Sequence, residues 1–349
     1  MNSKTLKSVL VIIILMIFSC DEPETIVTDI VHTDGSVTRR IEMRNKKKDF
    51  DSSKLRVPVD STWSYKDTVV YEMKNGKRDT TWIRTAEKNF ISVDEINKEY
   101  LTDKGCNKAS KRFVSFSRKF KWFNNEYRFS ENVGKGLKYG YPIENYLNRE
   151  EMNFFYLPKS ISEEKMAGAD STKFKLLNDT IEKKVERWFW SCNLAEWIEE
   201  FTKLTAGRAG DDISKENLKK NEREIVNMII TKEPGADTVI ISRFLGESNY
   251  RKFRKEADST SSTISKRVEE LSSFKEYSLR VSMPGKVIST NGYIDKNGEL
   301  LWPVKSDFFL SCQYEMWAVS KISNTWAWIV SGLFLLFVLA GLIFRVIKK

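Results

Sequence analysis

The segment 308–344, FFLSCQYEMWAVSKISNTWAWIVSGLFLLFVLAGLIF, decides the fold because its hydrophobic period changes part-way along. Its first part alternates apolar with other side chains, which predicts one long strand. The apolar face of that strand would consist of Phe308, Leu310, Cys312, Tyr314, Met316 and Ala318. Its second part, 325–344, carries no charge and is long enough to cross a bilayer as a helix. Only residues 321–324 separate the two parts, so the sequence predicts a sheet held close to a membrane.

The residues that flank the apolar run are typical of a transmembrane helix, because tryptophans favour the membrane–water interface and basic residues favour the cytoplasmic side. We expect five of them to anchor the helix at the two interfaces: Trp326, Trp328, Arg345, Lys348 and Lys349. The sequence therefore predicts a transmembrane helix over 325–344 and a cytoplasmic tail over 345–349. The alternative is the core helix of a soluble protein, which such flanks do not favour.

The first twenty residues have the three parts of a bacterial signal peptide. A short basic region precedes the apolar run 9–18, which is too short to span a membrane, and Ser19 and Cys20 follow. The stretch IFSC resembles the lipobox of bacterial lipoproteins, which implies removal of residues 1–19 and a lipid on Cys20. The alternative is an uncleaved anchor with an incidental cysteine. Asp21 resembles the inner-membrane retention signal of such lipoproteins.

The two ends together predict the location of the chain. The signal peptide would export residue 21, and the basic tail would keep the C-terminus inside the cell. The bulk of the chain would then lie on the periplasmic, extracytoplasmic side of the inner (cytoplasmic) membrane, as the exported domain of a single-pass protein.

The composition supports a folded domain without nucleic-acid chemistry. Hydrophobic residues make up 41% of the chain and aromatic residues 12%, which is enough for a core. Five of the 58 Lys and Arg residues flank the two apolar ends, which leaves 53 basic against 48 acidic residues in between. That excess is too small to predict a nucleic-acid partner.

The exported part has β-rich ends and a helical middle. Period-two patterns fill 20–141 and 276–324, whereas apolar residues recur at helical spacing over 142–275. We predict an α+β fold in which N- and C-terminal hairpins build an antiparallel β-sheet, with a helical insertion and a C-terminal transmembrane helix. Ser92 and Asn148, each followed three residues later by glutamate, are predicted helix caps.

Two tight hairpins are predicted near the N-terminus, because Asx-Gly pairs favour two-residue turns. The first would turn at Asp34-Gly35. Its apolar face would hold Ile26, Ile30, Val37 and Ile41. The second would turn at Asn75-Gly76, which sets Asp67 opposite Arg84 as a cross-strand ion pair.

A third hairpin, KRFVSFSRKFKWFNNEYRFSENV (111–133), is predicted to turn at Asn124-Asn125. That turn would gather seven apolar residues on one face: Val114, Phe116, Phe120, Trp122, Tyr127, Phe129 and Val133. Interleaved basic and aromatic residues also occur in proteins that bind single-stranded nucleic acid. The simpler interpretation is an amphipathic hairpin with a solvated basic face, and contact with anionic lipid head groups is a third interpretation.

A short C-terminal segment resembles the LppM-type lipoprotein domain. Met283-Pro284-Gly285, Asn291-Gly292 and Trp302 match its Met-Pro-Gly turn, its Asn-Gly pair and its tryptophan in order, over 281–304. The arrangement of signal peptide, β-rich domain and C-terminal span is also similar. The resemblance implies an envelope-facing β-sheet domain with lipid or glycolipid contact, and it brings no catalytic residues.

Few residues of the chain suggest catalysis, and no cofactor or metal site is predicted. His32 is the single histidine, which argues against a Ser-His-Asp triad and against multi-histidine zinc sites. Beyond Cys20, the cysteines are Cys106, Cys192 and Cys312; they allow one internal disulfide, although buried free thiols are expected for Cys192 and Cys312, which lie on apolar faces.

Five pairs of neighbouring acids leave a hydrolase as the alternative function: Glu150-Glu151, Glu163-Glu164, Glu199-Glu200, Asp211-Asp212 and Glu269-Glu270. Two carboxylates that meet in a fold can cleave glycans. Neighbouring acids on helices are more often solvated surface. We therefore predict a non-enzymatic cell-envelope protein whose exported domain binds membrane lipid, glycolipid or an envelope protein, with a hydrolase of envelope glycans as the alternative.

Overall fold

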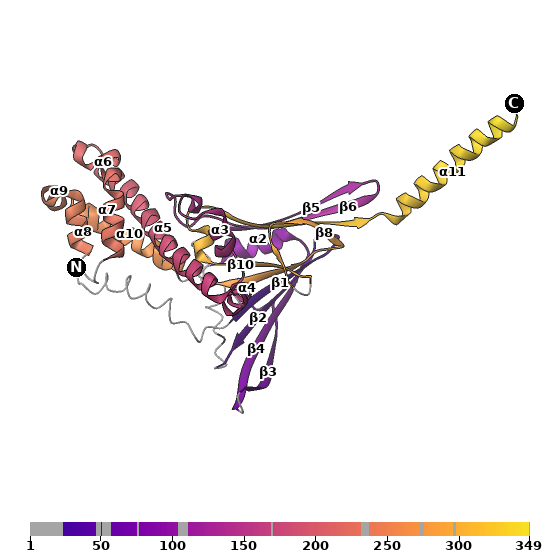
Figure 1. Ribbon diagram of the computed structural model, residues 1–349, viewed down its shortest axis with the longest axis horizontal. Helices are drawn as coiled ribbons and strands as arrows, with labels where there is room; N and C mark the ends of the chain where they lie inside the picture. The colour runs from indigo at the N-terminus through magenta and orange to yellow at the C-terminus, as the bar shows by residue number, and fades with distance from the viewer. Residues whose placement is uncertain are drawn as a thin grey trace.

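The computed structural model describes residues 24–46, 50, 57–74, 77–103, 111–168, 170–231, 237–272, 276–295 and 298–348. Two β-sheets form the centre of the molecule, a lobe of helices lies to one side of them, and helix α11 extends from the opposite side (Figure 1). The fold is therefore α+β, as the sequence predicts.

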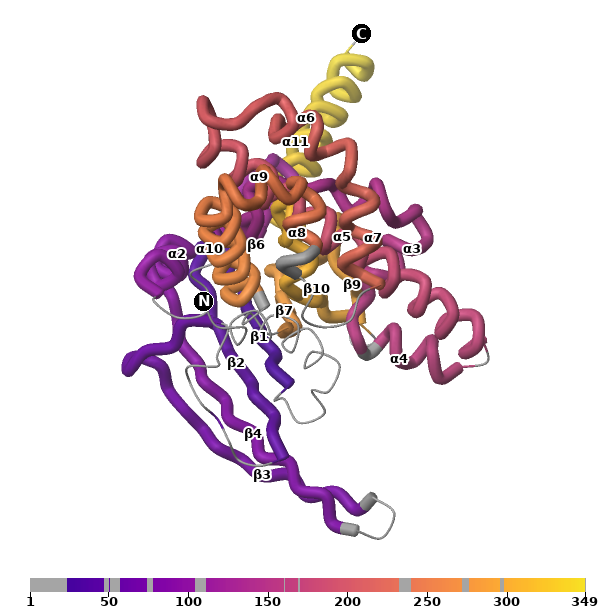
Figure 2. The backbone as a smooth tube through the Cα atoms, turned by 90° about the vertical axis from the view of Figure 1, so that its left-hand side faces the viewer, coloured from indigo at the N-terminus to yellow at the C-terminus, as the bar shows by residue number. Residues whose placement is uncertain are grey.

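Sheet A contains seven strands in the order β3-β4-β2-β1-β7-β10-β9. Its strands are β1 (Glu24–Val31), β2 (Val37–Asn45), β3 (Ser64–Lys74), β4 (Lys77–Phe90), β7 (Tyr277–Ser282), β9 (Tyr293–Ile294) and β10 (Leu300–Val304). β1 pairs with β7 in parallel, whereas the other neighbours pair antiparallel. The first and last strand-forming regions of the chain thus share one sheet, as predicted. β3 and β4 project from the body as a long hairpin (Figure 2).

Sheet B contains four strands in the order β5-β6-β11-β8. These are β5 (Arg112–Lys121), β6 (Asn124–Val133), β8 (Lys286–Thr290) and β11 (Tyr314–Ser323), and all of their pairings are antiparallel. β11 lies between β6 and β8, so the strand that leads into α11 is held on both sides.

The helices fall mainly between the two strand-forming regions, and α5 is the longest of them. They are α2 (Val93–Thr102), α3 (Arg149–Phe155), α4 (Lys159–Ala167), α5 (Ser171–Thr205), α6 (Lys215–Lys220), α7 (Glu222–Ile230), α8 (Asp237–Leu245), α9 (Glu247–Lys252), α10 (Arg254–Ser272) and α11 (Thr325–Ile347). Short 3₁₀ turns are η3 (Ile143–Asn145), η4 (Asp211–Ile213) and η5 (Ser306–Phe309). Asn148 forms the complete capping box predicted for α3, whereas the side chain of Ser92 makes no capping hydrogen bond to α2.

Two apolar cores hold these elements together. The first lies between the sheets, because it contains Val27 and Ile41 from sheet A together with Val114 and Phe129 from sheet B. The second lies within the helical lobe, around Phe201. Helix α5 enters both, so its 35 residues tie the lobe to the sheets.

The first hairpin differs from the prediction in register. Val31 pairs with Val37, so three residues, Thr33 to Gly35, lie between a pair formed by His32 and Ser36. One extra loop residue shifts the register by one, and such a shift turns every side chain of one strand to the other face. Val27 and Val31 are therefore buried with Val37 and Ile41, and Ile30 is exposed, contrary to the prediction.

In the second hairpin the predicted strand pairing is correct, whereas in the third hairpin the predicted turn is wrong. Asp67 faces Arg84 across β3 and β4 as predicted, and the Arg84 Nε and Nη2 atoms lie 2.8 and 2.9 Å from the Asp67 carboxylate oxygens. In the third hairpin Lys121 pairs with Asn124, so the turn is formed by residues 122–123 and not by the two asparagines.

The predicted long strand over 308–318 is half correct. Residues Phe308 to Leu310 are all buried, which a strand with one apolar face cannot achieve; Phe308 and Phe309 belong to the turn η5, and Leu310 is its C-cap residue. The carbonyls of Phe309 and Leu310 accept hydrogen bonds from residues 136 and 137 instead of from a strand partner. β11 begins at Tyr314, and from there the alternation holds, with Met316 and Ala318 buried.

Candidate membrane-interface site

The tip of the β5–β6 hairpin carries two aromatic residues, Trp122 and Phe123, in a two-residue turn. Asparagine and glycine are preferred in such turns, so two large exposed aromatics there call for a partner. The start of α11 supplies it: the ring centroids of Trp122 and Trp326 lie 5.2 Å apart, and those of Phe123 and Trp328 lie 4.2 Å apart. We call these four residues the aromatic joint.

The contact also includes a hydrogen bond from the Trp122 indole Nε1 to the hydroxyl of Ser331, at 2.9 Å. Ser331 lies within the apolar run, where few polar groups are available to a hydroxyl. The bond therefore fixes the hairpin tip against the first turns of α11.

A buried asparagine fastens the same tip to the end of β11. The amide nitrogen of Asn324 donates to the carbonyls of Lys121 and Trp122 at 2.8 and 3.1 Å, and its oxygen accepts from Asn125 at 2.8 Å. The backbone N–H of Asn324 donates to the carbonyl of Phe123 at 2.9 Å. Asn324 is also the N-cap residue of α11, so the strand, the turn and the helix meet at one side chain. We call this group the asparagine clasp.

Helix α11 itself is long and apolar enough to span a membrane. It runs from Thr325 to Ile347, three residues beyond the predicted span, and Ala327 is its buried residue. Beyond the contacts of Trp326, Trp328 and Ser331 with the hairpin tip, most of its apolar side chains are exposed, and the helix extends away from the body of the protein (Figure 1). A helix whose apolar side chains are mostly exposed suits an apolar environment, which a bilayer provides.

The outer face of sheet B next to this helix is basic. Lys119, Glu126, Lys321 and Lys286 are opposite one another across four strands, so their side chains share that face. Lys121 lies two residues from Lys119 on the same face and forms an ion pair with Glu126. This part of the face therefore carries four lysines and one carboxylate. We call Lys119, Lys121, Lys286 and Lys321 the lysine row.

Residues of the segment 281–304 connect the two sheets. The side chain of Asn291 donates to the carbonyl of Glu315, and its oxygen accepts from the backbone of Trp317 and, at 3.0 Å, from the indole of Trp302. Gly292 lies so close to that indole that a Cβ atom would be 2.4 Å from it. The chain thus passes from β8 in sheet B to β9 in sheet A at a point that requires glycine.

The Met-Pro-Gly turn lies against β11 near the membrane end. Gly285 has a φ of 77°, and a Cβ atom there would lie 2.4 Å from the carbonyl oxygen of Lys321. Ser320 donates from its hydroxyl to the carbonyl of Pro284 at 2.6 Å. This turn therefore supports the strand that leads into α11 from the side opposite β6.

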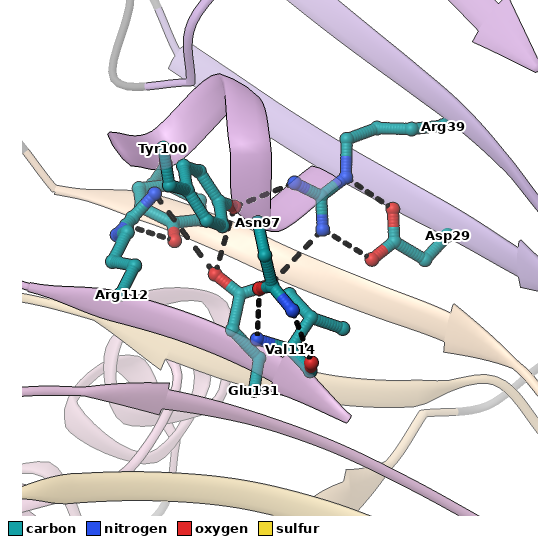
Figure 3. A network of polar contacts seen from close by, with 8 residues as sticks. Asp29, Arg39, Asn97, Tyr100, Arg112, Val114 and Glu131 are labelled. Atoms are coloured by element: carbon teal, nitrogen blue, oxygen red, sulfur yellow. Dashed lines mark hydrogen bonds and ion pairs between the residues drawn. The ribbon is translucent and has the colours of Figure 1, made fainter. Parts of the chain in front are cut away.

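A network of buried charges joins sheet A to sheet B (Figure 3). Arg39 of β2 makes two parallel hydrogen bonds to Asp29 of β1, from Nε and Nη2, at 2.7 Å each. Its guanidinium also reaches a carboxylate oxygen of Glu131 in β6 at 3.0 Å and the hydroxyl of Tyr100 in α2 at 2.5 Å. Tyr100 donates in turn to Glu131 at 3.0 Å. We call this cluster the inter-sheet network.

Arg112 balances the charge of the inter-sheet network. Its Nη1 atom lies 3.9 Å from Glu131, and its Nη2 atom donates to the hydroxyl of Tyr277. The two arginine and two carboxylate side chains are each no more than 1% exposed. Burial raises the pKa of Asp29, and the attraction of Arg39 opposes that rise. A buried cluster with equal numbers of both charges fixes one position of sheet B on sheet A.

Two of the predicted anchor residues contact the hairpin tip, and the other described ones lie at the opposite end of α11. Trp326 and Trp328 meet the hairpin tip, whereas Arg345 and Lys348 are exposed at the far end of α11. Lys349, Cys20 and the predicted signal peptide lie outside the described residues. Sequence reasoning missed Trp122, Phe123 and Asn324 as members of the site. A signal existed in the aromatic pair itself, since two bulky residues before Asn-Asn are unusual in a solvated hairpin.

Several of the acidic residues considered for catalysis are engaged in caps or ion pairs. Among the predicted acid pairs, Glu151 caps α3 and binds Lys184 at 2.6 Å, Glu163 lies 4.0 Å from Lys159, and Glu199 pairs with Lys215. Over the residues that the structure describes, no cluster of His, Cys, Asp and Glu could hold a metal ion. His32 is exposed beside the first turn.

The described cysteines are free thiols. Cys192 is buried, and burial raises its pKa to about 12. Cys312 is exposed, contrary to the prediction. It follows the turn η5 and precedes β11, so it lies outside the strand whose apolar face it was predicted to share. Cys106 lies outside the described residues.

Comparisons with models of protein families, with curated proteins and with solved structures gave no match to this chain.

Proposed function

We propose that the protein is a non-enzymatic, membrane-anchored envelope protein whose exported domain rests on the bilayer surface and binds anionic lipid head groups. The observation that supports this most is the aromatic joint, since Trp122 and Phe123 lie beside the first turn of α11. Tryptophans at the start of a span lie at head-group depth, so the hairpin tip would lie there too.

The lysine row supports the choice of anionic lipid. It follows the same hairpin and the end of β11, so it would face the membrane surface. A basic residue close to an anionic leaflet contributes about 1 kcal/mol of attraction. The asparagine clasp makes the position of these lysines rigid relative to α11, which a flexible linker would not do.

The predicted location follows from the same proposal. A lipid on Cys20 together with α11 would attach both ends of the domain to the inner membrane, with the bulk of the chain on the periplasmic side. Mass spectrometry of the mature N-terminus tests the lipid: a mass equal to the unmodified chain from residue 20, or the presence of residues 1–19, would contradict it.

The head-group proposal is tested with the full chain in detergent. Native mass spectrometry would count bound phosphatidylglycerol and phosphatidylcholine for the wild type and for the variant Lys119→Gln/Lys121→Gln/Lys321→Gln. We expect the wild type to retain phosphatidylglycerol preferentially and the variant to lose at least about tenfold in affinity, since each lysine contributes about 1 kcal/mol.

The matched control is Lys173→Gln/Lys175→Gln/Lys183→Gln, which removes three exposed lysines from α5. It should retain the preference of the wild type. Equal retention of both lipids by the wild type, or an equal loss in the control, would refute head-group binding by the lysine row.

A further inference from the structure

A second site lies in the helical lobe, where an open pocket of about 540 Å³ is formed between α5, α6 and α7. Its walls carry four cationic side chains: Arg187 from α5, Lys219 and Lys220 from α6, and Arg223 from α7. One carboxylate, Glu222, is also present. Pockets of this volume accommodate small molecules and are much larger than a single inorganic anion requires.

The positive charge of the pocket is largely uncompensated. Lys219 and Arg223 make no hydrogen bond or ion pair with any residue that the structure describes. Arg187 donates to the side chain of Asn227 at 2.7 Å, which orients its guanidinium without neutralising it. Lys220 likewise contacts an amide oxygen, that of Asn217, at 2.8 Å.

The single carboxylate hydrogen-bonds a tyrosine hydroxyl and attracts one of the four cations, Lys219. Glu222 accepts a hydrogen bond from the hydroxyl of Tyr141 at 2.5 Å, and burial raises its pKa. With Glu222 ionised, the pocket still carries a net charge of three positive units, from four cations and one anion. Such a concentration of charge around a hollow favours a compact polyanion.

The floor of the pocket offers neutral hydrogen-bonding groups. Ser191 is buried and hydrogen-bonds the hydroxyl of Tyr146, and Val226 supplies an apolar surface beside them. Burial raises the pKa of Tyr146, so its hydroxyl remains protonated at neutral pH. A ligand with hydroxyl groups next to its anionic group would match this combination of charged rim and polar floor.

We infer that this pocket binds a small phosphorylated molecule of about the size of a sugar phosphate. A phosphate monoester carries up to two negative charges in one group, which suits three uncompensated positive charges better than a single carboxylate does. Two arginines offer planar forks to phosphate oxygens, and two lysines add point charges. Because α6 and α7 lie across the molecule from α11, the ligand is a soluble one and not a head group of the anchoring membrane (Figure 1).

The test is calorimetric titration of the full chain in neutral detergent with glucose 6-phosphate, inorganic pyrophosphate and glucose. We expect both phosphate compounds to bind saturably, and glucose not to bind. The variant Arg187→Gln/Arg223→Gln should weaken the binding of glucose 6-phosphate by at least about tenfold, because both charge-assisted forks are lost.

A matched control separates the pocket from the general charge of the lobe. Lys255→Gln/Lys266→Gln removes two exposed lysines from α10 and should change the affinity by less than about twofold. An equal loss in this control would overturn the pocket assignment. Binding of glucose as tight as that of its phosphate, or no saturable binding up to about 10 mM, would overturn the phosphate assignment.

If the arginine variant does not fold, the variant Tyr146→Phe tests the pocket instead, because it removes one hydroxyl from the pocket lining and leaves the ring. A several-fold weaker affinity supports the pocket, and an unchanged affinity overturns it. The variant Lys119→Gln/Lys121→Gln/Lys321→Gln should bind glucose 6-phosphate like the wild type. The pocket and the head-group proposal therefore succeed or fail independently.

Discussion

Sheet B is attached to the rest of the molecule in two contrasting ways. On one side the inter-sheet network joins it to sheet A through Arg39, Asp29 and Glu131, which are buried and fully paired. At its other end the aromatic joint and the asparagine clasp join it to α11 through rings that are about half exposed and through amide hydrogen bonds.

The difference reflects the surroundings of the two junctions. A charge in the protein interior costs several kcal/mol unless its partner stays in place, so the inter-sheet network permits one arrangement of the sheets. Aromatic and amide groups suit a boundary between water and lipid, where each ring has an apolar body and a polar edge. One junction therefore contributes to global stability, whereas the other controls local geometry at the start of α11.

The largest loss of stability is expected from Arg39→Met in the inter-sheet network. It leaves Asp29 and Glu131 buried without their cation, which should lower the free energy of unfolding by about 3–5 kcal/mol. Urea titration of the full chain in detergent, followed by circular dichroism, measures this loss. The neighbouring Arg40 pairs with Glu87 at the surface, so Arg40→Met should cost less than about 1 kcal/mol. Similar losses in both variants would show that burial does not distinguish the network.

A smaller effect is expected at the membrane end from Asn324→Ala. The substitution leaves the carbonyls of Lys121 and Trp122 without their side-chain donor and should destabilise the hairpin tip by about 1–3 kcal/mol. Hydrogen exchange should accelerate in the backbone of residues 121–125 and stay unchanged in sheet A. Ser323→Ala, an exposed change one residue earlier, is the control and should alter neither region. Faster exchange throughout sheet A would mean that the two junctions are not separable.

The smallest effect concerns an ion pair of intermediate exposure, between Glu151 of α3 and Lys184 of α5. The hydrogen bond from Lys184 lowers the pKa of Glu151 below its usual value of 4.5. A lowered folded-state pKa adds stability above the unfolded-state pKa, and that stability is lost as the pH falls through the folded-state value. Glu151→Gln keeps the capping box and removes the charge, so it should cost about 0.5–1 kcal/mol at neutral pH.

The pH dependence provides the measurement for that pair. The difference in unfolding free energy between the wild type and Glu151→Gln should shrink between about pH 6 and pH 3, because both states become protonated. The control is Glu163→Gln, which removes one charge of an exposed helix pair with an N–O distance of 4.0 Å and should change the unfolding free energy by less than about 0.5 kcal/mol. A difference that grows toward low pH would contradict the assigned direction of the pKa shift.

Strand pairing was easier to predict than turn geometry. Asp67 and Arg84 face each other as expected, because a two-residue turn and a long alternating pattern leave one register. The prediction for the first hairpin was wrong by one loop residue. As a result Val31 is on the buried face of β1 and Ile30 is on the exposed face. The predicted turn of the third hairpin was wrong because contacts with α11 hold Trp122 and Phe123 in the turn. These contacts outweigh the local preference for the two asparagines at that position.

The buried charges could not have been predicted from local pattern. Arg39 lies between Val37 and Ile41 on the apolar face of its strand, where a charged residue contradicts the alternation. One partner, Asp29, lies in the neighbouring strand β1, but the others come from α2 and β6, 61 and 92 residues away in the sequence and adjacent only in the fold. The pocket in the helical lobe has the same origin, since its basic residues come from three helices.

The α+β class, the helical middle and the apolar C-terminal helix follow from the amino-acid sequence, because periodicity and hydrophobic length act over neighbouring residues. Only the tertiary structure decided which charges are buried together, which turn meets α11 and where the basic pocket forms. Those features depend on contacts between distant segments, and one residue of register or one loop residue changes which side chains meet.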